Sequence, residues 1–161
     1  MNTCLELTTA LIRQAVAEDE VAVRECAERA YGQYTDLLGQ KPAPMTADFG
    51  KQISAGQVHV ALDREGIFLG FIVFYPDALG MHIESVAVLP SAAGRGVGRA
   101  LVRFCEQQAG RQAIAAVHLY TNEKMTRNLK LYSRLGYVEM ARRIEDGFHR
   151  VFFRKELSQK I

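Results

Sequence analysis

The sequence has 161 residues, of which 48% are hydrophobic and 24% charged, which excludes wholesale disorder and favours a single folded domain over residues 1–161. Twenty lysines and arginines against 18 acidic residues leave a net charge of +2, which argues against nucleic acid or an anionic membrane as a partner. No signal peptide is evident, and the apolar stretch IFLGFIVFY is too short to cross a bilayer as a helix.

The three cysteines, Cys4, Cys26 and Cys105, lie far apart and form no CxxC pair. This spacing predicts neither a disulfide framework nor a metal site, and it favours a reducing, cytoplasmic compartment. Cys26 and Cys105 fall on apolar helix faces, so we interpret them as buried structural thiols.

The first half of the chain predicts loosely ordered residues 1–8, a strand at 10–14 and a helix that starts after Asp19. The segment LGQKPAPM is predicted to be a loop, followed by a second helix at 46–54. Strands at 58–63, 67–75 and 82–89 follow, joined by short turns. Because the connections are short, we expect these three strands to be antiparallel neighbours.

The second half predicts a helix at 98–112, a strand at 115–120 and a helix at 126–135 that Thr126 caps and Gly136 ends. Strands at 138–143 and 150–154 close the chain around a turn at Asp146. The crossover from 82–89 to 115–120 should be parallel. The fold class is therefore α/β (α+β), with a mixed, mostly antiparallel central sheet of about seven strands and helices on both faces.

A glycine-rich turn follows the strand that stops at Pro90, and it contains Gly94, Gly96 and Gly98. Glycines let the backbone approach a ligand closely, and the N–H groups at the start of the next helix favour a phosphate. The lysine and hydroxyl of a P-loop are missing, and Arg99 stands where a dinucleotide fingerprint needs its third glycine. The turn therefore predicts a phosphorylated ligand of another kind.

The segment VAVLPSAAGRGVGRALV resembles the acyl-CoA pyrophosphate loop of the GNAT-type N-acetyltransferase superfamily, with its pattern [QR]-x-x-G-x-[GA]. The segment NLKLYSRLGYVE is similar to the later part of that family, in which a tyrosine-bearing helix precedes L-G-[FY]. Ala93 stands where the family usually has Gln or Arg, and Met125 where it often has Asn. The resemblance covers most of residues 10–155.

The resemblance implies acetyl-CoA as the cofactor and direct acetyl transfer. It also implies that the strand at 82–89 carries a bulge and splays from its neighbour, so that pantetheine lies in the gap. The implied cofactor-binding residues are Val86, Ala87, Val88, Ala93, Gly94, Arg95, Gly96, Val97, Gly98, Arg99 and Asn128. The backbone N–H near Val88 is the implied donor for the oxyanion.

His82 and Glu84 lie two residues apart on a strand and therefore share a face. Because titratable residues are unusual in a buried strand, we interpret Glu84 as the general base that deprotonates the amine. The alternative is a carboxylate that satisfies a neighbouring backbone group or arginine. For His82, contact with the substrate at the rim and a catalytic role both stay open.

By resemblance, Tyr132 protonates the leaving sulfur. It could also be a core tyrosine, since Met125, Leu129 and Tyr132 form one helical stripe. The resemblance further implies that Tyr31, Tyr34 and residues 35–45 line the acceptor site, although both tyrosines could equally be packing residues.

The sequence thus predicts an N-acetyltransferase that moves the acetyl group of acetyl-CoA to a primary amine of a small molecule or peptide. The alternative is a non-catalytic acyl-CoA-binding sensor or regulatory protein. A third hypothesis, acylation of a tRNA-borne amine, would need a basic patch. The oligomeric state, a homodimer included, is left open.

Overall fold

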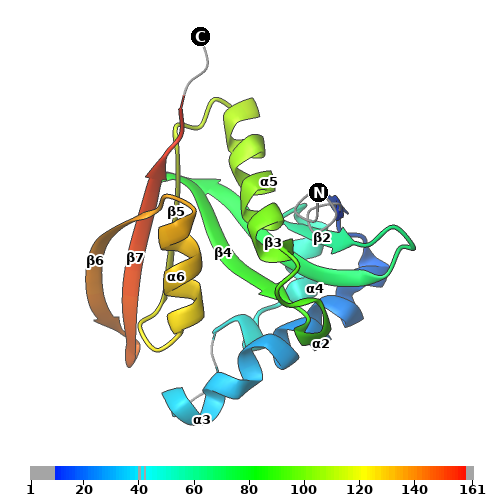
Figure 1. The fold of residues 1–161 in the computed structure, drawn as a ribbon, viewed down its shortest axis with the longest axis horizontal. Helices are drawn as coiled ribbons and strands as arrows, with labels where there is room; N and C mark the ends of the chain where they lie inside the picture. Colours follow the sequence, from blue (N-terminus) through cyan, green and yellow to red (C-terminus); the bar gives the residue numbers. More distant parts are fainter. Residues whose placement is uncertain (1–9, 40, 42, 159–161) are drawn as a thin grey trace, which may run out of the picture.

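The structure is a computed structural model that describes residues 10–39, 41 and 43–158 (Figure 1). The predicted looseness of residues 1–8 and the position of Cys4 lie outside the described residues. None of the described helices is both long and apolar enough to cross a membrane.

Seven strands form one mixed sheet in the order β1-β2-β3-β4-β5-β7-β6. The parallel pair is β4 with β5, and the other neighbours are antiparallel, as predicted. The strands are β1 (Leu11–Gln14), β2 (Val58–Leu62), β3 (Phe68–Asp77), β4 (Gly80–Val88), β5 (Ala116–Asn122), β6 (Val138–Glu145) and β7 (Phe148–Glu156).

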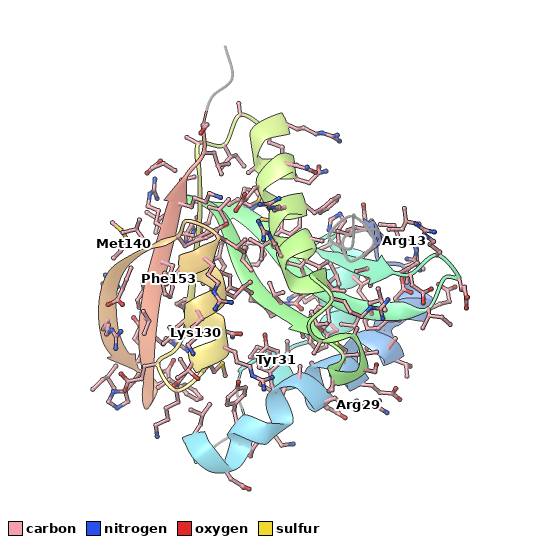
Figure 2. All side chains as sticks on the ribbon, in the orientation of Figure 1. Arg13, Arg29, Tyr31, Lys130, Met140 and Phe153 are labelled. Atoms are coloured by element: carbon pink, nitrogen blue, oxygen red, sulfur yellow. The ribbon has the colours of Figure 1, made fainter. Side chains whose placement is uncertain are left out.

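Helices cover both faces of this sheet, which confirms the predicted fold class. Alternate residues of β3 face opposite sides: Ile72 belongs to one buried cluster, and Phe71 and Val73 belong to the other. The first cluster includes residues of α5 (Val97–Arg111) and α6 (Thr126–Arg134). The second includes residues of α2 (Glu20–Tyr31) and α4 (Phe49–Ser54). Figure 2 shows Phe153 of β7 beside α6, within the first cluster.

Three local predictions need correction. The segment 38–45 was predicted as a loop, but Leu38 is the last residue of the short helix α3 (Thr35–Leu38), and a 3-10 turn covers Ala43–Thr46. The next helix, α4, begins at Phe49 rather than at 46, because the Asp48 side chain caps it by accepting the Lys51 N–H at 3.1 Å. Thr126 is the first residue of α6 and not its cap.

A bulge interrupts the pairing of β3 with β4. Val73 lies opposite Ser85, whereas the next residue, Phe74, lies opposite Ile83. Glu84 is therefore the extra residue of β4, and the bulge lets it share a face with Ser85 while Ile83 points the other way. This is the bulge that the resemblance implied.

β4 also parts from β5, as the resemblance implied. The two strands pair only as far as Ile83 opposite Leu119, and beyond this point they diverge (Figure 1). The Leu89 N–H donates to the Leu69 carbonyl at 2.9 Å, and antiparallel hydrogen bonding alternates from residue to residue. The backbone groups of Val86 and Val88 therefore point away from β3, toward the gap.

Candidate active site

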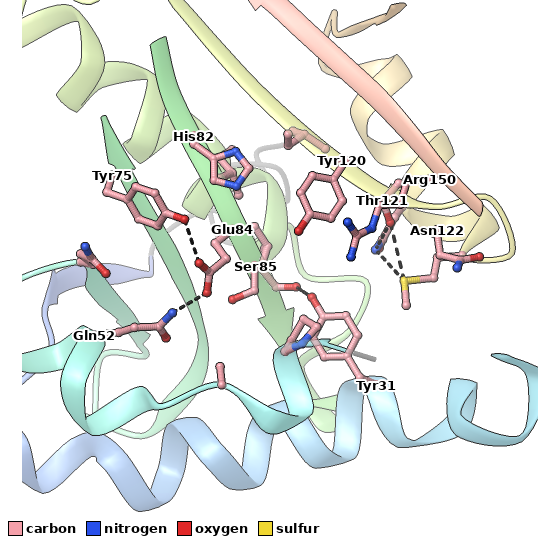
Figure 3. Close-up of a pocket in the computed structure, with 18 of the residues that line it drawn as sticks. Tyr31, Gln52, Tyr75, His82, Glu84, Ser85, Tyr120, Thr121, Asn122 and Arg150 are labelled. Atoms are coloured by element: carbon pink, nitrogen blue, oxygen red, sulfur yellow. Dashed lines mark hydrogen bonds between the residues drawn. The ribbon is translucent and has the colours of Figure 1, made fainter. Parts of the chain in front are cut away.

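A cavity of about 520 Å³ lies at the point where β4 and β5 diverge. Residues 83–86 of β4 and 119–122 of β5 form two of its walls, and α4 and β7 contribute further side chains (Figure 3). A cavity of this size is large enough for a small-molecule substrate.

Six of the predicted site residues line this cavity: Tyr31, His82, Glu84, Val86, Asn128 and Tyr132. The others do not line it: Tyr34, Ala87, Val88, Ala93, Gly94, Arg95, Gly96, Val97, Gly98 and Arg99. The second group lies mainly in the glycine turn that follows β4, so the predicted residues divide into a cavity set and a turn set.

Glu84 projects from the bulge into the cavity, where two side chains hold it. The Tyr75 hydroxyl donates to Oε1 at 2.9 Å, and the Gln52 amide donates to Oε2 (Figure 3). Neither partner is the backbone group or the arginine that the alternative interpretation required. Burial, followed by the hydrogen bond to this carboxylate, raises the pKa of Tyr75, which therefore stays a donor near neutral pH.

His82 lies on the same face as Glu84, as predicted, and is only 9% exposed. Its ring is 4.8 Å from that of His118 and 5.5 Å from that of Tyr75. Burial, with a contribution from His118, lowers the pKa of His82, so the ring is neutral near pH 7. Nδ1 is buried and has no hydrogen-bond partner among the described residues.

His118 Nε2 lies 2.8 Å from Asp77 Oδ1, and the ligand atoms of Asp77, His82 and His118 all lie within 4.8 Å of one another. The absence of a metal site, predicted from the cysteine spacing, stays a prediction.

Tyr132 of α6 is both a core residue and a cavity residue, which combines the two interpretations of its helical stripe. Its side chain is 5% exposed, and its ring lies 5.7 Å from that of Tyr137. The hydroxyl makes no hydrogen bond to any described residue. Burial, and then the neighbouring Tyr31, raise the pKa of Tyr132, so the phenol keeps its proton.

Tyr31, at the end of α2, reaches the free edge of β4 (Figure 2). Its hydroxyl donates to the Val86 carbonyl at 2.5 Å, in the gap that β5 leaves open. Tyr34 is partly buried against the neighbouring core cluster and does not reach the cavity. The two tyrosines that the sequence grouped together therefore have different environments.

Asn128 lines the cavity from the first turn of α6. Its amide donates to Thr121 Oγ1 at 3.3 Å and approaches Met125 Sδ at 3.7 Å. Met125, which stands where the family often has asparagine, is buried and lines the same cavity. The polar group in this region is thus Asn128.

The glycine turn has the geometry of an anion cradle. Gly94 and Gly96 have φ of +79° and +78°, conformations that favour glycine. Gly96 also occupies the cap position of α5, so no side chain covers the first N–H groups of that helix. Arg95 and Arg99 are exposed beside these N–H groups, and a Cβ on Gly98 would lie 3.7 Å from Val88. The turn thus adjoins the free edge of β4 and fits a pyrophosphate.

The two described cysteines, Cys26 and Cys105, are buried free thiols, as predicted. Burial raises the pKa of both, that of Cys26 to about 12. Neither thiol lines the cavity, so neither is placed to act as a nucleophile there.

The side chains of the site that sequence reasoning missed include Gln52, Tyr75, Tyr120 and Arg150. Tyr75 carried a signal, because the short turn between the two predicted strands places it opposite His82. The other three depend on contacts between elements that are distant in the sequence.

Comparison with known proteins agrees with the family resemblance found in the sequence. The family model described as Acetyltransferase (GNAT) family matches residues 22–137. The mycothiol acetyltransferase of Thermomonospora curvata is 35% identical over 81 residues, which are 49% of this chain and only 27% of that protein.

The solved structures extend the similarity over the fold. Ard1 from Thermoplasma volcanium superposes with a TM-score of 0.74 at 19% identity, over 93% of this chain and 99% of that one. The PaiA N-acetyltransferase from Thermoplasma acidophilum, in complex with coenzyme A, gives 0.76 at 16% identity, over 92% and 99%. The ribosomal-protein-S18-alanine N-acetyltransferase from Escherichia coli gives 0.74 at 17% identity, over 94% and 96%.

At these identities the structural similarity shows the fold alone, whereas the family match spans β4, the glycine turn and Tyr132. As the sequence predicted, the chain therefore belongs to the acetyltransferase (GNAT) family, a family of acyltransferases whose cofactor is acetyl-CoA.

Proposed function

We propose that this chain moves the acetyl group of acetyl-CoA directly to a primary amine, with Glu84 as general base and Tyr132 as general acid. The observation that carries the proposal is that both side chains line one cavity where β4 and β5 part. The position of Glu84 in the bulge supports it, because a bulge re-aims a side chain beside an active site.

Acetyl-CoA, when bound, supplies the acetyl group as a thioester. The residues that would hold its pyrophosphate are those of the turn from Ala93 to Arg99, through backbone N–H groups and the two arginines. Val86 and Val88 would pair with its amide arm, since their backbone groups face the gap. Ala87 turns its backbone toward β3 and would contribute only through its position between them. Asn128 offers a side-chain amide.

Glu84 is proposed to take the proton from the amine, directly or through a water molecule. Tyr75 and Gln52 fix its carboxylate with two hydrogen bonds, so the base is oriented before the substrate arrives. The Val88 N–H, turned toward the same gap, is proposed as a donor to the negative charge that develops during transfer.

Tyr132 is proposed to hold the proton for the leaving sulfur. Burial keeps its hydroxyl protonated, and no described residue competes for that proton. His82 and Tyr31 are proposed as contacts to the acceptor or to its immediate surroundings, since both line the cavity. Tyr34 stays a candidate only as support for Tyr31.

The acceptor is proposed to be an amine of a small molecule or peptide. Names among the relatives include mycothiol acetyltransferase and ribosomal-protein-S18-alanine N-acetyltransferase, which mention a small molecule and a protein, respectively. A homodimer, the reducing compartment, the absence of a nucleic-acid partner and the extent of the domain over residues 1–161 stay predictions.

The test is a panel of primary amines incubated with acetyl-CoA while free CoA thiol is measured, for the wild type and for Glu84→Gln. We expect amine-dependent thiol release by the wild type and a loss of about 100-fold or more in the variant. If calorimetry showed tight acetyl-CoA binding while no amine released CoA, the sensor alternative would replace the enzyme.

A further inference from the structure

We propose that the acceptor is a small amino carboxylate and that Arg150 binds its carboxylate. This inference rests on the proposed function, because it assigns a substrate class to the same cavity. It starts from a cationic side chain in the cavity wall that the acetyl-transfer chemistry does not use.

Arg150 projects from β7 beside Tyr120, on the side of the cavity away from Gln52 and Glu84 (Figure 3). Its guanidinium carbon lies 4.4 Å from the ring centroid of Tyr120 and 5.7 Å from that of Phe148. Both rings also line the cavity. Contacts with two aromatic rings favour one orientation of the guanidinium and thereby reduce the entropy lost when it binds a ligand.

The hydrogen bonds of Arg150 leave most of its donors available. A guanidinium carries five N–H donors, and here only Nη1 has an acceptor among the described residues, Glu145 Oε1 at 2.9 Å. The side chain is only 14% exposed, yet none of its nitrogens is among the buried unpartnered atoms of the described residues. Because Arg150 lines the cavity beside Tyr120 (Figure 3), the donors that Glu145 leaves free are available to a molecule bound there.

Glu145 orients Arg150 but accepts a hydrogen bond from only one nitrogen of the guanidinium, Nη1. It is more exposed than Arg150, at 38%, so water screens its charge more effectively. An arginine held along one edge can still bind a planar carboxylate through another edge with two parallel N–H···O bonds. Arg150 is therefore a preorganised anion site rather than a saturated ion pair.

The remaining charges of the cavity agree with this assignment. Glu84 supplies negative charge on one side, where the amine must lie, and Arg150 supplies positive charge across from it. On α4 and its cap, Lys51 and Asp48 add one positive and one negative charge, which offset each other. A molecule with an amine at one end and a carboxylate at the other meets both sides. A polycationic amine would be repelled by Arg150.

The carboxylate takes no part in the bond changes. The amine nitrogen forms a bond to the acetyl carbon while the carbon–sulfur bond of the thioester breaks. Glu84 receives the amine proton, and Tyr132 gives its proton to the leaving sulfur. The products are an N-acetyl amino carboxylate and CoA, so atoms and charge balance without another reactant.

The first test uses the wild type alone. Amino acids and ω-amino acids of increasing chain length are compared with their carboxamides, with free CoA thiol as the readout. Charge-assisted hydrogen bonds predict that kcat/KM for the carboxylate exceeds that for the matched carboxamide by about 10- to 100-fold. Equal values for acid and amide would overturn the inference while leaving the proposed function standing. Acetylation of no amine at all would instead overturn the proposed function.

The second test replaces Arg150. Arg150→Gln should abolish the difference in kcat/KM between the carboxylate and the matched carboxamide. Arg150→Lys should recover part of the preference for the carboxylate, because lysine keeps the positive charge but lacks the paired N–H donors of the guanidinium. A preference that survives Arg150→Gln would refute the role of Arg150.

Arg143→Gln is the matched control. Arg143 lies opposite Arg150 in the β6–β7 pair and has its guanidinium carbon 4.9 Å from the Phe152 ring centroid, but it does not line the cavity. Arg143→Gln should keep the acid preference, and its loss would point to general charge instead of a site. Unchanged acetyl-CoA binding by calorimetry confirms that each variant is folded. A phosphate monoester of an amino alcohol that outperforms every carboxylate would contradict the carboxylate assignment.

Discussion

Tyr132 and Tyr137 allow catalysis to be separated from stability with two conservative substitutions. Their rings lie 5.7 Å apart, yet their hydroxyls have opposite environments. The Tyr132 hydroxyl lines the cavity without a hydrogen bond to any described residue, whereas the Tyr137 hydroxyl donates to Glu106 Oε2 at 2.8 Å. Removing one oxygen from each ring should therefore affect different properties.

For Tyr132→Phe we expect kcat to fall by about 100- to 10,000-fold, the range that a positioned general acid contributes. This corresponds to about 3 to 5 kcal/mol in the activation barrier. KM for acetyl-CoA should change little. Because the variant loses no hydrogen bond to a described residue, its free energy of unfolding should stay within about 0.5 kcal/mol of the wild type.

For Tyr137→Phe the expectation is reversed. A hydrogen bond to a carboxylate contributes about 1.5 to 3 kcal/mol, and without it Lys155, at 3.2 Å, is the remaining partner of Glu106 among the described residues. A loss of about 2 kcal/mol corresponds to a fall in Tm of about 4 to 8 °C for a domain of this length. The value of kcat should be unchanged.

Steady-state kinetics and urea denaturation of both variants provide the measurements. A Tyr132→Phe variant with the kcat of the wild type would remove Tyr132 from the mechanism. A variant that lost activity and stability together would show that Tyr132 acts through packing.

Three further predictions concern the cradle, the buried histidines and the free strand edge. Gly94→Ala should raise KM for acetyl-CoA several-fold at unchanged kcat. A Cβ at this position meets open space, but it strains a backbone with φ of +79° by about 1 kcal/mol. If steady-state kinetics showed an unchanged KM, the turn would be excluded as a cofactor contact. Burial lowers the pKa of His82 and of His59, so as pH falls below about 6.5 the unfolded chain binds protons that the folded chain does not. The free energy of unfolding should therefore decrease from pH 7 to pH 5. In urea titrations at several pH values, His82→Phe should reduce this pH dependence by up to about 1.4 kcal/mol per pH unit. An unchanged pH dependence would contradict the prediction. Tyr31→Phe should lower the free energy of unfolding by about 1 kcal/mol in thermal or urea unfolding, because the Val86 carbonyl loses its donor. Tyr34→Phe should leave it unchanged. Equal effects of the two substitutions would contradict the contribution of the hydrogen bond between Tyr31 and Val86.

The parts of the fold that local sequence determines were predicted closely. The helix after the glycine turn was expected at 98–112 and lies at Val97–Arg111, because glycines and an apolar stripe define both its start and its buried face. The antiparallel order of β2, β3 and β4 followed in the same way from short turns between alternating segments. Glu84 and His82 were placed on one face by the strand period alone.

The rest of the site depends on contacts between distant segments. β7 inserts between β5 and β6, so Arg150 reaches the cavity through a strand order that no local pattern encodes. Gln52 meets Glu84 because α4 packs on the sheet, a tertiary contact that its own helix does not specify. The segment 38–45 was wrongly expected to be a loop throughout, since Gly39 ends α3 and Pro44 lies within a 3-10 turn.

The pH dependence of kcat/KM for Glu84→Gln, compared with the wild type, tests the central claim most directly. If Glu84 accepts the amine proton, the variant should be about 100- to 10,000-fold slower near neutral pH. Its activity should then recover toward that of the wild type as pH rises and the free amine loses its proton without help. A loss of the same size at every pH would show that Glu84 positions the substrate instead, and undiminished activity would contradict the account.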